Sequence, residues 1–200
     1  MKIIVIGGTG TIGRKVVERL SSTHELIIAG RRTGDMNVDI ADAESIKRIY
    51  ENAGQVDAVI CTAGEVSWGK LHDLSEEEHY KGIRNKLMGQ INLVRIGMDF
   101  LPPGGSFTLT SGILAEDPVV GTSSAAMVNG ALHGFVKAAA QELGKDRRIN
   151  VVAPGLVEDS YKQLGEMFPG RNPVPMMRVV SAYIRSVEGK GNGEIIRVYV

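Results

Sequence analysis

The amino-acid sequence predicts a three-layer α/β fold built around a doubly wound parallel sheet. Short apolar runs alternate with longer segments of helical character, and this β-α order repeats along all 200 residues. The first run, 3–6, is apolar throughout, as expected of a strand that helices cover on both faces. Since no repeat, low-complexity segment or linker interrupts the pattern, we expect residues 1–200 to form a single domain.

The individual elements follow from local signals. The pattern Ser75-x-x-Glu78 is a capping box, which predicts that a long helix starts within 73–78 and runs toward Phe100. Two prolines and two glycines at 102–105 end that helix. By apolar spacing, strands are expected at 3–6, 26–29, 37–40, 56–62, 106–110, 149–153 and 195–200, and further helices at 11–21, 43–51, 125–143, 161–168 and 174–187.

Composition argues against several classes of protein. A formal net charge of zero without a Lys/Arg run disfavours nucleic-acid binding. Cys61 is the only cysteine, so no internal disulfide is possible, and His24, His72 and His79 have no partner at metal-ligand spacing, so no metal is expected. No window approaches the ~20 apolar residues of a membrane helix, and the first apolar run is too short for a signal peptide. We expect a cytoplasmic protein without a membrane partner.

A glycine-rich turn follows the first strand and opens the first helix. Such a turn lets the backbone approach a pyrophosphate at a helix N-terminus, and its strand-turn-helix context is that of a Rossmann fold. A Walker A phosphate loop is excluded because Arg14 and Lys15 follow the last glycine. The turn predicts a dinucleotide cofactor, and the residues expected to contact it are Gly7, Thr9, Gly10, Thr11, Ile12 and Gly13.

The end of the second strand indicates which dinucleotide binds. An acidic residue there would favour the ribose hydroxyls of NAD(H), but the chain has Arg31 and Arg32. Two guanidinium groups suit the 2′-phosphate of NADP(H), which they can bind through charge-assisted hydrogen bonds. Asp35 keeps NAD(H) open as the less favoured cofactor. Alternatively, the two arginines are ordinary solvated loop residues.

Several segments together make the whole chain resemble the short-chain dehydrogenase/reductase family. Asp39-Ile40 is similar to the pair that contacts adenine, and Ala63-Gly64 ends a segment similar to the family's Asn-Asn-Ala-Gly. Gly134-Phe135 resembles the interior of the family's long active-site helix. The segment 149–155 resembles its sixth strand, whose Pro154-Gly155 turn is expected near the nicotinamide. The resemblance implies a Rossmann-fold oxidoreductase.

Members of this family use a catalytic Asn-Ser-Tyr-Lys tetrad, and this chain has other residues at the matching positions. The chain contains no Tyr-x-x-x-Lys, and alignment on Gly134-Phe135 puts Ala125 at the tyrosine position and Asn129 at the lysine position. The serine position falls on Gly112, beside Ser111. Lys86 takes the asparagine position, unless a shift of one residue restores Asn85. Lys86 and Asn129 have then exchanged places, which would keep an amine near the nicotinamide ribose; alternatively, Lys86 is a surface lysine.

The residues expected at the reaction site are Lys86, Ser111 and Asn129. Without the tyrosine, the proton donor is Lys86, Ser111 acting through water, or Tyr161 in the expected substrate-covering segment, and the sequence does not choose among them. His133 is assigned a packing or surface role, because it lies two turns beyond Ala125.

Three functions remain open from the sequence. The favoured one is an NADP(H)-dependent oxidoreductase acting on a small carbonyl or alcohol. The second is a non-catalytic NADP(H)-binding protein, either a redox sensor or a partner-binding module. The third is a structural or interaction protein that has kept the fold but not the ligand. The resemblance also implies a homodimer or homotetramer, paired through helices at about 76–100 and 125–143 and closely packed at Ala138, Ala139 and Ala140.

Overall fold

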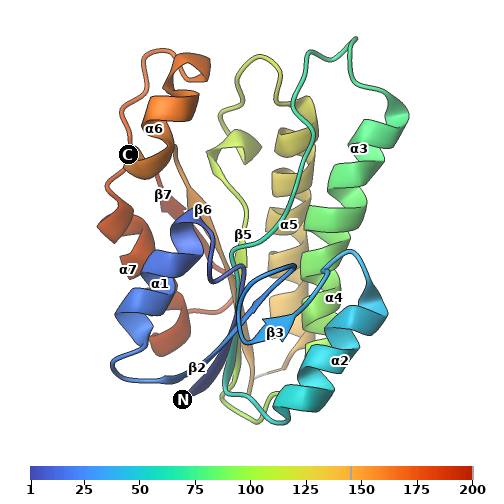
Figure 1. Cartoon of the computed structure of the whole chain (residues 1–200), viewed down its shortest axis with the longest axis vertical. Helices are drawn as coiled ribbons and strands as arrows, with labels where there is room; N and C mark the ends of the chain where they lie inside the picture. Colours follow the sequence, from blue (N-terminus) through green and yellow to red (C-terminus); the bar gives the residue numbers. More distant parts are fainter. Residues whose placement is uncertain (145, 200) are drawn as a thin grey trace.

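The computed structural model describes residues 1–144 and 146–199, and it forms one parallel sheet with helices on both faces (Figure 1). The seven strands lie in the order β3-β2-β1-β4-β5-β6-β7, which confirms the predicted doubly wound topology. They are β1 (Lys2–Ile6), β2 (Glu25–Gly30), β3 (Met36–Asn37), β4 (Ala58–Cys61), β5 (Ser106–Thr110), β6 (Arg148–Pro154) and β7 (Ile195–Val198).

Helices α1 and α7 cover one face of the sheet, whereas α2, α4 and α5 cover the other (Figure 1). No helix in the described part of the chain combines the length and apolarity that crossing a bilayer requires. The helices are α1 (Thr11–Leu20), α2 (Ala43–Ala53), α3 (Glu76–Gly82), the π-helix η1 (Ile83–Leu87), α4 (Met88–Gly97), the 3-10 helix η2 (Ile113–Ala115), α5 (Ser123–Glu142), α6 (Glu158–Leu164), the 3-10 helix η3 (Gly165–Met167) and α7 (Met176–Glu188).

The apolar core has two layers because successive strand residues point to opposite faces. In β1, Ile4 and Ile6 join the cluster under α2, α4 and α5, while Ile3 and Val5 join the cluster under α1 and α7. All four side chains are almost fully buried. Continuous apolar strands therefore serve both layers, as the sequence predicts.

Some predicted elements were wrong in their limits. The strand expected at 37–40 is only Met36–Asn37, because the Asp39 amide turns away to the Ser45 hydroxyl. The helix expected from 73–78 to Phe100 is interrupted by η1. The helix expected at 161–168 begins at Glu158 and ends in the 3-10 turn η3. β7 ends at Val198, and the expected strand end at Val200 lies outside the described residues.

The alanines expected at a subunit contact do not all face outward. Ala139 and Ala140 on α5 are 7% and 5% exposed and belong to the core cluster of their own chain. Only Ala138 of the three is exposed. This part of the prediction was wrong, because the helical repeat turns two of three consecutive alanines toward the sheet.

Candidate functional site

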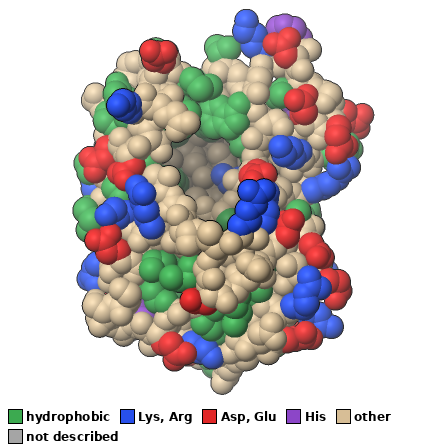
Figure 2. All heavy atoms as spheres, in the orientation of Figure 1, with side chains coloured by type: hydrophobic (Ala, Val, Ile, Leu, Met, Phe, Trp, Pro, Cys, Tyr) green, Lys and Arg blue, Asp and Glu red, His purple; other side chains and the backbone are tan. Residues whose placement is uncertain are grey.

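The carboxyl ends of the strands meet at one edge of the sheet, where the loops after β1, β4, β5 and β6 converge (Figure 1). Open α/β sheets bind ligands at this edge. Figure 2 shows a hollow in this region, with charged side chains of both signs on its rim. Two pockets of about 250 and 220 Å³ lie there. They adjoin, because consecutive residues Glu65 and Val66, and likewise Asn85 and Lys86, line one pocket each.

We call the first the glycine-turn pocket. It collects residues that the sequence predicted for a dinucleotide from four separate segments. The predicted residues that line it are Gly7, Thr9, Gly10, Arg31, Asp39, Ile40, Ala63 and Gly64. Ile12, Pro154 and Gly155 line the adjoining pocket, and Thr11, Gly13 and Arg32 line neither.

Glycine is required where α1 meets the turn. Gly7 has a φ of +78°, and the Gly10 amide donates a 2.9 Å hydrogen bond to the Gly7 carbonyl. A Cβ on Gly13 would collide with that carbonyl oxygen and lie 2.7 Å from Thr62 Oγ1. The Thr62 hydroxyl in turn reaches the carbonyls of Ile6 and Gly7, each at 3.1 Å. Gly13 therefore contributes by letting α1 approach closely, which leaves the N-terminus of the helix facing the pocket.

An ion pair stands on the rim of the glycine-turn pocket. Arg31 Nη2 lies 2.7 Å from Glu65 Oε1, and the side chains are 49% and 50% exposed. The Glu65 backbone amide donates to Asn85 Oδ1 at 2.8 Å, which holds the Glu65 backbone in place. Glu65 was missed from the sequence because it lies 34 residues from its partner.

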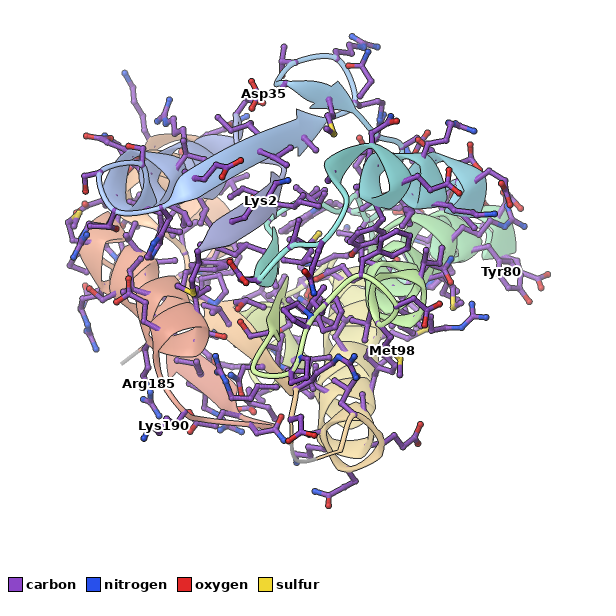
Figure 3. The ribbon with its side chains drawn as sticks, turned by 90° about the horizontal axis from the view of Figure 1, so that it is seen from below. Lys2, Asp35, Tyr80, Met98, Arg185 and Lys190 are labelled. Atoms are coloured by element: carbon purple, nitrogen blue, oxygen red, sulfur yellow. The ribbon has the colours of Figure 1, made fainter. Side chains whose placement is uncertain are left out.

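Asp35 is engaged by its own strand. Its Oδ2 accepts a 2.8 Å hydrogen bond from the Ile28 amide, and its amide donates to the Ile28 carbonyl at 2.7 Å. Figure 3 shows Asp35 beside the edge of the sheet formed by β2 and β3. The carboxylate therefore satisfies the backbone of β2, which has no β3 partner at Ile28.

The second pocket, which we call the Lys86 pocket, depends on the π-turn η1. The Met88 amide donates to the Ile83 carbonyl five residues back, so one extra residue is accommodated in this turn. As a result the neighbours Asn85 and Lys86 both face the site. The aliphatic stem of Lys86 crosses Gly64, where a Cβ would lie 2.5 Å from Lys86 Cγ.

Lys86 is partly buried, and its ammonium lies inside the pocket. Its Nζ donates to the Ser111 carbonyl at 3.3 Å. Burial lowers the pKa of Lys86 to about 8, and the nearby Cys61 opposes this shift. An amine with this pKa holds a proton at neutral pH and releases it more readily than an exposed lysine.

The other predicted tetrad positions lie around the same pocket. Ser111, Ala125 and Asn129 all line it. Asn129 is 3% exposed, and its Oδ1 has no hydrogen-bond partner among the described residues. A buried acceptor without a donor carries a free-energy cost unless a ligand supplies the donor. The ribose hydroxyls of a dinucleotide are donors of the required kind, so this side chain fits the expected cofactor.

One candidate from the sequence needs correction. Tyr161 is 43% exposed and packs on Gly165, while its helix presents Ser160 and Leu164 to the pocket instead. His133 is 8% exposed, which agrees with the packing role among its two expected roles, but the sequence did not indicate its contact with the site: its Nε2 lies 2.8 Å from Ser111 Oγ. The available signal was its position four residues after Asn129, which puts both on one face of α5.

Comparison with known proteins agrees with this geometry. The family model described as Enoyl-(Acyl carrier protein) reductase matches residues 11–173. Versicolorin reductase 1 from Dothistroma septosporum is 29% identical over 167 residues, and Short chain dehydrogenase claC from Passalora fulva is 30% identical over 148. The alignments cover 78% and 71% of this chain, but only 63% and 53% of those proteins.

Solved structures match over the full chain. The protein lin1944 from Listeria innocua is 47% identical with a TM-score of 0.97, and the match covers 100% of both chains. A small-chain dehydrogenase in complex with NADPH is 29% identical with a TM-score of 0.88, covering 100% of this chain and 96% of that one. With the family model matching most of its length, the chain belongs to the short-chain dehydrogenase/reductase family of oxidoreductases.

Proposed function

We propose that this protein is an NADP(H)-dependent oxidoreductase that interconverts a small carbonyl compound and its alcohol. The observation that carries the proposal is the adjacency of the two pockets. The glycine turn lines one of them, and Lys86, Ser111 and Asn129 line the other together with Pro154-Gly155. A cofactor extended across both would bring its reactive end to the polar residues of the second.

Three observations support NADP(H) over NAD(H). Arg31 lines the glycine-turn pocket, where its guanidinium suits a 2′-phosphate. Asp35 is bonded to the backbone of β2 and is thereby less available to a ribose hydroxyl. The similar small-chain dehydrogenase was crystallised with NADPH.

The residues of the Lys86 pocket divide the work of the reaction. When bound, the reduced nicotinamide supplies a hydride. The Lys86 ammonium and the Asn129 amide hold polar groups of the cofactor or substrate, in the exchanged arrangement that the sequence predicts. Ser111 presents a hydroxyl to the substrate oxygen. Ala125, at the tyrosine position, leaves apolar space and cannot move a proton. A pocket of about 220 Å³ suits a small substrate.

Calorimetric titration of the purified protein with NADPH and NADH tests the cofactor. We expect micromolar NADPH binding, weaker NADH binding, and loss of the preference in Arg31→Ala/Arg32→Ala. Each hydrogen bond to a charged group contributes about 1.5–3 kcal/mol, so NADPH affinity should fall by about 10- to 150-fold. Arg48→Ala is the matched control, because the Arg48 side chain on α2 is 61% exposed and lines neither pocket. An absence of binding to either nucleotide would refute the proposal.

The reaction is tested by following NADPH oxidation with phenanthrenequinone, nitrobenzaldehyde and cyclohexanone as probe carbonyls. The replacement of the tyrosine by Ala125 also favours a second function, a redox sensor that binds NADP(H) without turnover. Tight NADPH binding without oxidation by any probe would support the sensor, whereas turnover that falls in Lys86→Ala would support the oxidoreductase.

A further inference from the structure

A chain of polar contacts leads out of the Lys86 pocket, away from Lys86 itself. It begins at Ser111 Oγ, which lies 2.8 Å from His133 Nε2. On the other side of the ring, His133 Nδ1 lies 3.8 Å from Glu116 Oε1. The His133 side chain is 10% exposed and that of Glu116 is 37% exposed. The contacts therefore connect a buried hydroxyl with a carboxylate at the protein surface.

The Glu116 carboxylate is fixed in its position. It accepts hydrogen bonds from Arg197 Nη2 at 2.6 Å and from Arg197 Nε at 2.9 Å, and the Tyr199 hydroxyl donates to it at 2.7 Å. These contacts, led by those to Arg197, lower the pKa of Glu116 to about 2. The group beside His133 is thus a permanent anion at neutral pH, and it stabilises the imidazolium form.

We propose that Ser111, His133 and Glu116 form a proton relay between solvent and the Lys86 pocket, in which Ser111 meets the substrate oxygen and His133 supplies the proton. This inference rests on the proposed oxidoreductase function and names the proton donor that takes over from the absent tyrosine. A hydroxyl has one donor and two acceptor sites, so Ser111 Oγ can accept from His133 while donating into the pocket.

The proton moves in two transfers during reduction. As the carbonyl carbon gains the hydride, its C=O π bond breaks and the oxygen takes the proton from Ser111 Oγ. Ser111 Oγ takes the Nε2 proton of protonated His133, which becomes neutral and keeps its Nδ1 proton toward Glu116. Water then returns a proton to His133, so one hydride and one solvent proton are consumed per alcohol formed. Oxidation of the alcohol runs the same transfers in reverse and needs neutral His133.

Several charges around His133 set the pH at which it works. Burial lowers the pKa of His133 most strongly; Glu116, in the loop after β5, raises it, while Arg197 on β7 and Lys137 on α5 lower it. Tyr199 lies beyond Glu116 and stays neutral, because burial and its bond to Glu116 raise its pKa to about 12. Reduction should therefore slow by about tenfold per pH unit above the pKa of His133.

The first test measures the imidazole directly and needs no substrate. Four histidines are present, so ¹³C-labelled histidine gives four NMR signals, and His133→Gln identifies that of His133. We expect its pKa below the ordinary value, and a further decrease of about half a unit or more in Glu116→Gln. A His133 signal that does not titrate between about pH 4 and 9 would overturn the relay, since histidines ordinarily titrate within this range.

The second test compares pH profiles of NADPH oxidation with the most active probe carbonyl. Glutamine at 133 can donate a hydrogen bond to Ser111 but cannot titrate, so His133→Gln should be about 10²-fold slower and should lose the limb of the profile at the pKa of His133, while a limb from Lys86, whose pKa is about 8, stays. In Glu116→Gln, the pH above which the rate of NADPH oxidation falls should decrease by the same amount as the pKa of His133 measured by NMR. Glu116 lies at the surface, so this substitution should not disturb the core. His72→Gln, at an exposed histidine, is the control.

Retention of the wild-type rate and profile in His133→Gln, or an unmoved limb in Glu116→Gln, would refute the relay alone. An inactive wild-type protein would instead refute the oxidoreductase function, and the relay with it.

Discussion

The Arg31–Glu65 ion pair lies on the rim of the glycine-turn pocket, yet we expect it to weaken the binding of NADPH. If Arg31 binds the 2′-phosphate of NADPH, Glu65 competes for the same guanidinium at 2.7 Å and repels the phosphate. Glu65→Gln should therefore tighten NADPH binding. An exposed ion pair contributes about 0.2–1 kcal/mol, and both side chains here are about half exposed, so the gain should be about 1.4- to 5-fold in Kd.

Isothermal titration calorimetry of wild type and Glu65→Gln with NADPH and NADH measures this effect. NADH has no 2′-phosphate, so its affinity should stay unchanged. The difference should shrink at high salt, because exposed charges are screened over about 10 Å at 0.1 M ionic strength. Glu51→Gln is a matched control, since Glu51 forms a similarly exposed pair with Lys47 on α2. Weaker NADPH binding in Glu65→Gln would refute the reasoning and indicate that Glu65 itself contacts the cofactor.

Three further predictions concern the glycine turn, the protonation of Lys86 and the oligomeric state. Gly13→Ala should lower the free energy of unfolding by about 1–3 kcal/mol and weaken NADPH binding more than about tenfold, because its Cβ meets the Gly7 carbonyl. A variant with the same unfolding free energy and the same NADPH affinity as the wild type would contradict this. The pKa of Lys86 is lower in the folded than in the unfolded chain, so from about pH 8 to 10.5 the unfolded state binds more protons. Between these pH values, the free energy of unfolding of the wild type, measured in urea, should rise by about 1–3 kcal/mol relative to that of Lys86→Met. If the two free energies change in parallel with pH, this prediction is wrong. Finally, sedimentation should give a homodimer or homotetramer, and a monomer would end that expectation.

The sequence predicted the fold well because the responsible signals are local. Apolar runs buried on both faces marked the strands, and the glycines after 3–6 marked the turn into α1. The limits of the third strand were less predictable, because the Ser45 hydroxyl takes the Asp39 amide out of the ladder. A contact of this kind depends on where α2 packs, and it does not change the apolar periodicity from which strands are predicted.

The candidate site was only partly predictable, and the omissions are non-local. Lys86, Ser111 and Asn129 were identified by counting from motifs. The contact between His133 and Ser111 was missed because counting follows one helix, whereas Ser111 lies 22 residues away in the loop after β5. The bonds from Arg197 to Glu116 span 81 residues. No spacing rule brings such residues together before the sheet has formed.

The π-turn has a consequence for how this chain is aligned with its relatives. Packing fixes the helix on both sides of it: Gly82 lies against Ser124, and Gly89 lies against Ile40. The surplus residue must therefore stay between these points. Deleting one residue from Ile83–Leu87 would restore an ordinary α-helix only by rotating one flank through about 100°, which breaks one of those contacts. An ungapped alignment pairs Lys86 with the family's asparagine, whereas a one-residue gap pairs Asn85 with it. Whether Asn85 or Lys86 corresponds to the family's asparagine therefore depends on whether the relatives share this π-turn.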